Sequence, residues 1–320
     1  MKYYAAPMEG LTGYIYRRAH HRVFPGVDRY YTPFIMPGQK VLLRAKEARD
    51  LLPENNAGIP VVPQILSNQA EDFLHTAAAL HDLGYTEVNL NLGCPSGTVA
   101  SKHRGAGFLA LPEELDRFLE AIFAACPTAI SIKTRIGVEN AEEFPAILDI
   151  YNRYPVKELT VHPRLLKQKY RGYPDREAFA YALTNSRCPV CFNGDLFTRA
   201  DVEKTAAEFP GASALMLGRG LMADPALAQK AQGGPACDKV TLRRFHDLLL
   251  EDFIALQMGD KNVLFRVKEL WFYMIHLFPD SAKFAKAINK SQHLSDYLSA
   301  IERLFAERNV MEESDFRGTP

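Results

Sequence analysis

Two glycine-containing turns carry residues suited to holding a phosphate group. Gly218-Arg219-Gly220 ends an apolar run and precedes a short helical segment that begins near Asp224-Pro225. Asn193-Gly194-Asp195 ends the apolar run before it. Backbone N–H groups at such turns bind phosphate in many proteins, above all where a helix follows. One turn of this kind is more often a plain tight turn, but the two together favour a phosphate site.

Other apolar runs also carry or end in polar side chains. If the runs are parallel strands, their carboxyl ends meet at one edge, where barrel enzymes have their active sites. The side chains that would meet there include a thiol, amides, cations and an imidazole, which bind polar ligands and transfer protons. In chain order they belong to the segment 6–10 with Pro7, Met8 and Glu9, to Gln64, Asn91, Cys94, Lys133 and Arg135, and to His162.

Eight short runs rich in β-branched or aromatic residues would position these side chains. Several are apolar at nearly every position, as expected for strands covered on both faces. Helical patterns such as 68–83 and 112–125 lie between them. This alternation predicts an α/β fold, a (β/α)₈ or TIM barrel. A doubly wound open sheet is the main alternative, but the glycine fingerprint of its first turn is missing. The runs are 2–6, 29–35, 61–66, 87–92, 129–136, 158–162, 189–193 and 213–218.

After residue 235 the strand pattern stops. Gly233-Gly234-Pro235 is typical of a linker. The sequence therefore predicts two domains, a barrel over residues 1–234 and a helical bundle over residues 235–320. The helical patterns of the second domain cover 242–258, 263–278, 281–290 and 294–305.

The composition is that of an ordinary globular protein. The chain has 320 residues, 47% of them hydrophobic, and its 38 basic residues balance 38 acidic ones. Five scattered cysteines suit a reducing compartment, and neither a signal peptide nor a membrane-spanning run is visible, so we expect a cytoplasmic protein. The C-x-x-C sequence at 188–191 could be a redox or zinc motif, but no second pair accompanies it. We expect two strand residues there and no metal site.

Several sequence blocks, taken in order, resemble the signature of a known family. They are A-P-M-E-G-L-T at 6–12, N-L-G-C-P-S at 91–96 with G-A-G-F-L at 105–109, K-T-R-I-G at 133–137, H-P-R with Q-K-Y-R-G at 162–172, N-G-D at 193–195 and M-L-G-R-G at 216–220. The chain resembles the dihydrouridine synthases, FMN-dependent enzymes that reduce uridine in RNA. The resemblance implies NADPH as the reductant, tRNA as the first substrate to expect, and an RNA-binding role for the helical domain. We expect no membrane association and predict no protein partner.

The resemblance also implies roles for single residues. Hydride passes from the flavin to uracil C6, and Cys94 would donate the proton to C5, as a protonated thiol can. Lys133 and His162 would lie near the flavin ring, and Gln64 would bind its pyrimidine edge. The remaining cofactor-binding residues would be Pro7, Met8, Asn193, Gly194, Asp195, Gly218 and Arg219.

The target uracil would be held by Asn91, Arg164 and Tyr170, again by resemblance. An extruded base is stacked and read on its Watson–Crick edge, which calls for an amide, a guanidinium or an aromatic ring. The family often has threonine and a basic residue after the arginine of H-x-R, whereas this chain has Leu165 and Leu166. We therefore expect base recognition to differ at this point.

Local charge favours RNA as the partner. Between 261 and 290 the chain has six Lys or Arg against two acidic residues, and the loops 102–104 and 164–171 are also basic. Phosphate contacts from such residues give salt-sensitive binding. Three alternatives stay open: an FMN barrel enzyme for a free small molecule, of the dihydroorotate dehydrogenase kind; a synthase acting on ribosomal RNA; and an RNA-binding protein with a structural flavin.

Overall fold

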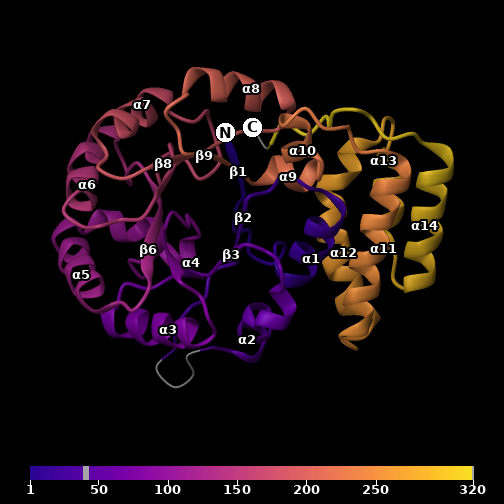
Figure 1. The fold of residues 1–320 in the computed structure, drawn as a ribbon. Helices are drawn as coiled ribbons and strands as arrows, with labels where there is room; N and C mark the ends of the chain where they lie inside the picture. Colours follow the sequence, from indigo (N-terminus) through magenta and orange to yellow (C-terminus); the bar gives the residue numbers. More distant parts are fainter. Residues whose placement is uncertain (39–42, 319–320) are drawn as a thin grey trace.

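A computed structural model describes residues 1–38 and 43–318. Nine parallel strands form one sheet, in the order β3-β2-β1-β9-β8-β7-β6-β5-β4, and the helices of residues 14–231 surround it (Figure 1). The strands are β1 (Lys2–Ala5), β2 (Arg29–Tyr31), β3 (Val61–Val62), β4 (Gln64–Ile65), β5 (Glu87–Leu92), β6 (Ala129–Arg135), β7 (Leu159–His162), β8 (Val190–Asn193) and β9 (Ala214–Leu217).

The two ends of this strand order are neighbours in the chain, so the sheet closes on itself. β3 pairs with β2 through Tyr30 and Val61, and β4 pairs with β5 through Gln64 and Asn89. Only Pro63 separates β3 from β4, and proline has no N–H to continue a ladder. β3 and β4 are therefore two halves of the single strand predicted over 61–66, and the predicted eight-stranded barrel is confirmed.

The helical patterns at 68–83 and 112–125 correspond to α3 and α5, each of which buries one apolar face. In α3, Phe73, Ala77 and Leu80 are buried, and in α5 so are Leu115 and Ile122. The helices are α1 (Tyr14–Val23), α2 (Ala45–Leu51), α3 (Ala70–Asp82), α4 (Gly97–Ala100), α5 (Pro112–Ala125), α6 (Phe144–Tyr151), α7 (Arg176–Asn185), α8 (Arg199–Glu208), α9 (Arg219–Ala223) and α10 (Leu227–Ala231). Short 3₁₀ turns lie at η1 (Pro53–Asn56), η2 (Gly105–Ala110) and η3 (Ala141–Glu143).

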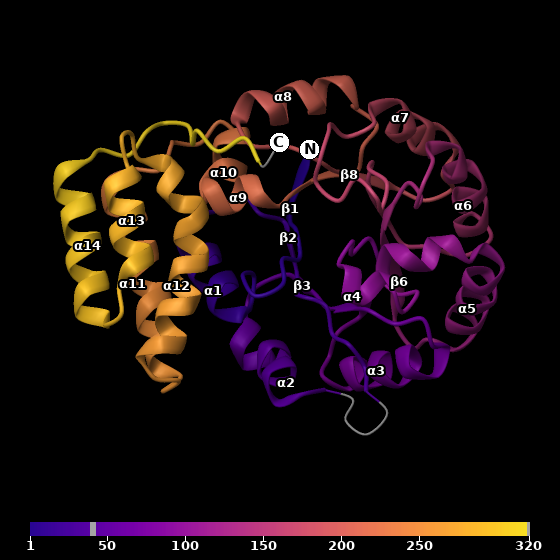
Figure 2. The ribbon, with the colours of Figure 1, turned by 180° about the vertical axis from the view of Figure 1, so that it is seen from behind.

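Four further helices form a bundle beside the barrel (Figures 1 and 2). The Phe245 ring of the first one packs against Tyr16 and Phe24 at the ends of α1, with ring centroids 5.8 and 5.3 Å apart. The helical domain predicted after residue 235 is thus present, while the boundary at residue 234 stays a prediction. The helices are α11 (Lys239–Ala255), α12 (Asp260–Met274), α13 (Ala282–Lys290) and α14 (Leu294–Glu307), with η4 (Ile275–Leu277) after α12.

The C-x-x-C segment at 188–191 lies at the start of a strand, as predicted. Cys191 is a buried residue of β8 and Cys188 lies just before that strand, where its thiol contacts Ser186. Within residues 1–38 and 43–318, no helix has both the length and the apolar character needed to cross a membrane.

Candidate active site

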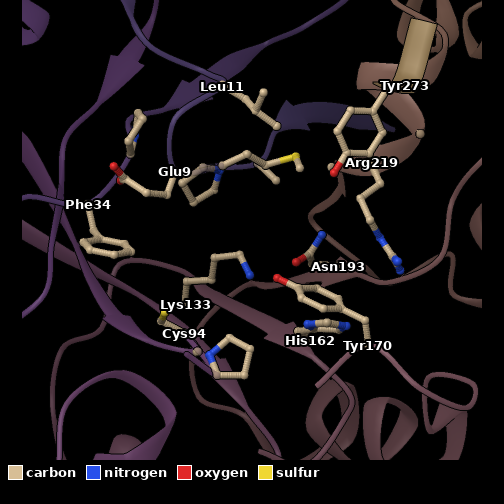
Figure 3. Close-up of a pocket in the computed structure, with 18 of the residues that line it drawn as sticks. Glu9, Leu11, Phe34, Cys94, Lys133, His162, Tyr170, Asn193, Arg219 and Tyr273 are labelled. Carbon is tan, nitrogen blue, oxygen red and sulfur yellow. The ribbon is translucent and has the colours of Figure 1, made fainter. Parts of the chain in front are cut away.

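A cavity of about 720 Å³ opens at the carboxyl ends of the barrel strands (Figure 3). This is the end at which barrel enzymes carry their chemistry. Its floor and walls come from the loops after the strands, and one wall comes from α12. The predicted site residues that line the cavity are Pro7, Met8, Gln64, Asn91, Cys94, Lys133, His162, Tyr170, Asn193, Gly194, Asp195, Gly218 and Arg219.

Asn91 holds the loop that carries Cys94. Its Oδ1 accepts the backbone N–H groups of Gly93 and Cys94, at 3.0 and 2.9 Å. Its Nδ2 donates to Oε1 of Gln64, 2.7 Å away. Gln64 in turn donates to Asn89, at 2.7 Å. These bonds fix the amides of Asn91 and Gln64, so each presents a defined edge to the cavity.

The block at 105–109 supports the same loop from behind. Gly105 has a φ of +57°, and a Cβ there would lie 2.9 Å from the carbonyl oxygen of Cys94. Only glycine fits this conformation and this approach. The next residue, Ala106, donates its N–H to that same carbonyl oxygen at 3.1 Å. The two blocks that the resemblance joined are therefore one structural unit around Cys94.

The Cys94 thiol is set up to stay protonated. Burial raises its pKa above the ordinary thiol value, an effect only partly opposed by a backbone hydrogen bond at Ser96 and by Arg135 and Lys133. A protonated thiol at the edge of a cavity can donate a proton to a bound ligand.

Lys133 points into the cavity from β6 (Figure 3). Burial and the nearby Arg135 lower the pKa of its ammonium to about 8. In the described part of the chain it makes no ion pair with a carboxylate. A partly buried ammonium without such a partner carries a desolvation cost, and a ligand with negative or acceptor character would relieve that cost.

His162 is held in one neutral form. Burial, followed by the charges of Arg135, Lys133, Arg164 and Arg219, lowers its pKa well below the ordinary value. Its Nε2 lies 3.0 Å from Nη1 of Arg164, and because a guanidinium can only donate, Nε2 accepts. The proton of the neutral ring is therefore on Nδ1, which makes that atom a donor.

Arg164 does not line the cavity. Its side chain is fully buried behind the wall and bonds Asp195 through both Nη1, at 3.0 Å, and Nη2. It also donates to the carbonyl oxygens of Arg171 and Gly172. Of the three residues that the resemblance implies for the uracil, Asn91 and Tyr170 face the cavity. The guanidinium of Arg164 instead bonds Asp195 and His162.

The two glycine-containing turns lie against each other. A Cβ at Gly220 would meet the carbonyl oxygen of Leu196 at 1.9 Å, so the turn after β9 packs directly on the one after β8. Arg219 donates to Oδ1 of Asp195 at 2.9 Å, and Nδ2 of Asn193 donates to the carbonyl oxygen of Met216. The juxtaposition that the phosphate prediction required is present, while phosphate binding itself stays a prediction.

A buried arginine fixes the loop after β1, which brings Pro7 and Met8 to the cavity. Arg17 donates to the carbonyl oxygen of Thr12 at 2.9 Å and pairs with Asp50 at 3.0 Å. The Thr12 hydroxyl accepts the N–H of Met8 at 2.9 Å. The loop is thus held from inside the protein, and Arg266 of α12 also donates to its Gly10 carbonyl oxygen at 3.1 Å, while Pro7 and Met8 line the cavity.

Sequence reasoning placed Arg135 at this end of the barrel without giving it a role, and it did not place α12 in the cavity wall. Arg135 follows Lys133 at the strand spacing of two residues, and its guanidinium lies under the Tyr170 ring at 5.6 Å. One face of α12 supplies Phe265, Lys268, Glu269, Phe272 and Tyr273. Their helical spacing was visible within 263–278, but it resembles the pattern of a core face.

The residues present fit a flavin. The cavity offers amides that can bind the pyrimidine edge, an ammonium and a neutral imidazole for the ring, and two glycine turns with Arg219 for a phosphate. Lys133, partly buried and without a carboxylate partner in the described part of the chain, is the observation that most calls for such a ligand.

Comparison with known proteins agrees with this assignment. Residues 4–311 match the family described as dihydrouridine synthase. A tRNA-dihydrouridine(16) synthase of Cupriavidus necator is 29% identical over 94% of this chain and 96% of its own, and one of Pseudomonas putida is 31% identical over 76% and 77%. Among solved structures, a variant of NCR from Zymomonas mobilis has a TM-score of 0.52 at 13% identity over 74% of this chain and 88% of its own, which shows the shared barrel. The predicted resemblance is confirmed: the chain belongs to the dihydrouridine synthase family.

Proposed function

We propose that this protein reduces uridine in tRNA to 5,6-dihydrouridine, with FMN as its cofactor and NADPH as its reductant. The observation that carries the proposal is the pairing, in one cavity of a dihydrouridine synthase, of a thiol kept protonated with a partly buried ammonium that has no carboxylate partner among the described residues. The thiol can act as the proton donor, and the ammonium can stabilise negative charge on the cofactor ring.

Each residue has a part in this reaction. A bound flavin supplies the hydride that goes to uracil C6, after taking it from NADPH. The Cys94 thiol gives its proton to C5, which leaves a thiolate that the solvent reprotonates. Lys133 stabilises negative charge on the reduced ring, and Asn91 holds the Cys94 loop while its free N–H reads the uracil edge.

The same proposal includes a position in the tRNA. Several curated relatives, from Cupriavidus, Ralstonia and Pseudomonas among others, are named tRNA-dihydrouridine(16) synthases. We therefore propose uridine 16 as the target. We also propose the cytoplasm, where tRNA is modified, as the place of the reaction.

The RNA would enter over the face that α12 shares with the barrel. Phe265 and Phe272 are more than half exposed there, and Lys268 lies between them on the same helix face. On the barrel side, Lys167, Lys169 and Arg171 belong to the loop after β7. Aromatic rings can stack on bases while such cations bind phosphates.

The test uses tRNA that lacks dihydrouridine, incubated with the purified protein, FMN and NADPH. We expect a gain of two mass units on uridine by nucleoside mass spectrometry, mapped to position 16 by sequencing. We expect Cys94→Ala to suppress the gain over the time of the assay, whereas Cys126→Ala, which removes a thiol at the end of α5, should not. Flavin binding and NADPH consumption without change in tRNA would refute the proposal and favour a free small molecule or ribosomal RNA as substrate.

A further inference from the structure

The chain after α14 returns to the barrel instead of ending in the bundle (Figures 1 and 2). We call residues 308–318 the C-terminal strap. Its backbone pairs with the segment around η4: Met311 donates its N–H to the carbonyl oxygen of Leu277 at 2.8 Å, and Asp315 to that of His276 at 3.0 Å. Most of the strap lies beyond residue 311, where the match to the family ends.

A buried lysine anchors the strap to the barrel. Lys230 of α10 is 3% exposed and pairs with the buried Asp224 at 2.6 Å. It also donates to the carbonyl oxygen of Glu312 at 2.7 Å and pairs with the carboxylate of Glu313 at 3.0 Å. A buried ammonium binds strongly to partners that satisfy its remaining donors, so this end of the strap is fixed.

Beyond this anchor, the strap inserts one aromatic ring behind the active site. Phe316 is 6% exposed, and its ring centroid lies 5.6 Å from that of Phe197 and 5.3 Å from that of Tyr273. Both of these neighbours line the cavity. Phe316 therefore ties a barrel residue and a bundle residue into one wall.

The strap also reaches Arg219. A Cβ placed on Gly318 would lie 3.2 Å from Nη1 of Arg219 and 3.1 Å from the Phe197 ring, so the strap backbone closes on both. On its other sides, Arg219 faces the rings of Phe197 and Tyr170, at 5.3 and 4.8 Å, and bonds Asp195. Its guanidinium has few directions left in which to move.

We propose that the C-terminal strap positions Arg219 and the Phe197–Tyr273 wall, and that Phe316 is a positioning residue for the end of the cavity where the cofactor phosphate binds. The assignment of that end to a phosphate rests on the proposed function. The strap itself acts without touching the ligand: it restricts a cation and two rings that do. Preorganising a charged side chain in this way strengthens ligand binding, because less freedom is lost on association.

Three variants test the strap. Phe316→Ala removes the inserted ring, and Phe316→Leu keeps most of its apolar volume. Phe305→Ala is the matched control, since Phe305 is buried to a similar degree, at 7% exposure, but packs on Trp271 and Phe278 inside the bundle. Both alanine variants lose a comparable core ring, so an effect of lower stability alone would appear in both.

The first measurement does not depend on a flavin. Phenylglyoxal labelling of arginine, followed by peptide mass spectrometry, should show severalfold faster modification of Arg219 in Phe316→Ala than in the wild type or in Phe305→Ala. Phe316→Leu should restore most of the protection. Equal labelling of Arg219 in the two alanine variants would overturn the role of the strap.

The second measurement is the affinity of the flavin-free protein for FMN, monitored through the quenching of FMN fluorescence on binding. We expect Phe316→Ala to weaken binding about tenfold, equivalent to about 1.4 kcal/mol, with the KM for tRNA unchanged in the loaded enzyme. Unchanged FMN affinity would overturn the role of the strap at the cofactor. A wild-type protein that binds no FMN, yet shows the labelling difference, would instead refute the proposed function and leave the strap's hold on Arg219 intact.

Discussion

Arg164 is the residue whose position differs most from what the resemblance implies, and replacing it tests whether it supports the site or contacts the RNA. Its guanidinium makes two bonds to Asp195, one to His162 and two to backbone carbonyl oxygens, all in a fully buried position. Arg164→Met keeps much of the volume and removes every one of these bonds. We expect a loss of both stability and cofactor affinity, because Asp195 and His162 line the cavity.

The size of the loss follows from the environment of the ion pair. Breaking a buried pair costs about 3–5 kcal/mol. The lower end applies here, because Asp195 is about one-fifth exposed and keeps its bond to Arg219. For a chain of this length the entropy of unfolding is about 0.7 kcal/mol/K, so a loss of about 3 kcal/mol lowers Tm by about 4 °C.

The assay combines thermal unfolding, FMN binding and steady-state kinetics with tRNA. In a double-mutant cycle with Asp195→Asn, the double variant should lose less stability than the sum of the two single losses, by at least about 1 kcal/mol, because both single variants break the same pair. Arg171→Met is the matched control: the same side chain is removed from the same loop, but at an exposed position. We expect the control to raise the KM for tRNA and to leave Tm within about 1 °C.

One outcome would refute this reasoning. If Arg164→Met raised the KM for tRNA tenfold while Tm and FMN affinity stayed at wild-type values, Arg164 would contact the RNA as the family resemblance implies. The loop would then have to rearrange on binding, because the guanidinium is buried in the structure described here.

Three further predictions follow from the cavity. Cys94→Ala should slow uridine reduction by about 10²–10⁴-fold, the usual contribution of a general acid. The rate at which NADPH reduces the flavin, measured by stopped flow, should stay unchanged. Because the pKa of this thiol is raised, wild-type activity should persist to pH values above the ordinary thiol pKa before it falls. Lys133, with a pKa of about 8, loses its charge as the pH rises from 7 to 9, so FMN affinity should weaken over that interval in a titration, and Lys133→Met should flatten the dependence. Gly220→Ala should yield insoluble or cofactor-free protein on purification, because its Cβ would overlap the carbonyl oxygen of Leu196.

The barrel was predictable because its strands are short apolar runs that burial on both faces requires. One departure, the division of 61–66 into β3 and β4, has a cause in the sequence: Pro63 cannot donate to the ladder, so the first half pairs with β2 and the second with β5. Two others are differences of extent: the strand predicted over 29–35 is β2 at Arg29–Tyr31, and the helix expected near Asp224-Pro225 is α9, which already begins at Arg219. The positions of strand ends then bring Gln64, Asn91 and Lys133 together without further information.

Side-chain direction in the loops was beyond the same reasoning. His162 ends a strand and Arg164 comes two residues later, a spacing that would place both on one face if the strand continued. The chain leaves the sheet at Pro163, and the guanidinium turns away from the cavity to bond Asp195. The H-P-R motif thus predicted that His162 and Arg164 belong to the site, but it could not predict that His162 lines the cavity and that Arg164 is buried behind it.

The wall formed by α12 was unpredictable for another reason. Phe265, Phe272 and Tyr273 have the spacing of a core face, and only the docking of the bundle decides that they border a cavity. The strap adds a similar case, since the contact of Phe316 with Phe197 joins residues more than a hundred positions apart. Contacts of this kind depend on tertiary arrangement, which local patterns do not encode.

The charges at the carboxyl end of the barrel connect these parts. Four cations, Lys133, Arg135, Arg164 and Arg219, surround His162, and each lowers its pKa, while Asp195 is the carboxylate that two of them share. Lys268, Glu9 and Glu269 also line the cavity, so the excess of positive charge that the folded protein must tolerate lies on the side around His162. A ligand that carries negative charge, such as a phosphate or a reduced flavin ring, offsets the repulsion between these positive charges. By keeping His162 neutral, the same cations leave a hydrogen-bond donor at Nδ1 that adds no further repulsion.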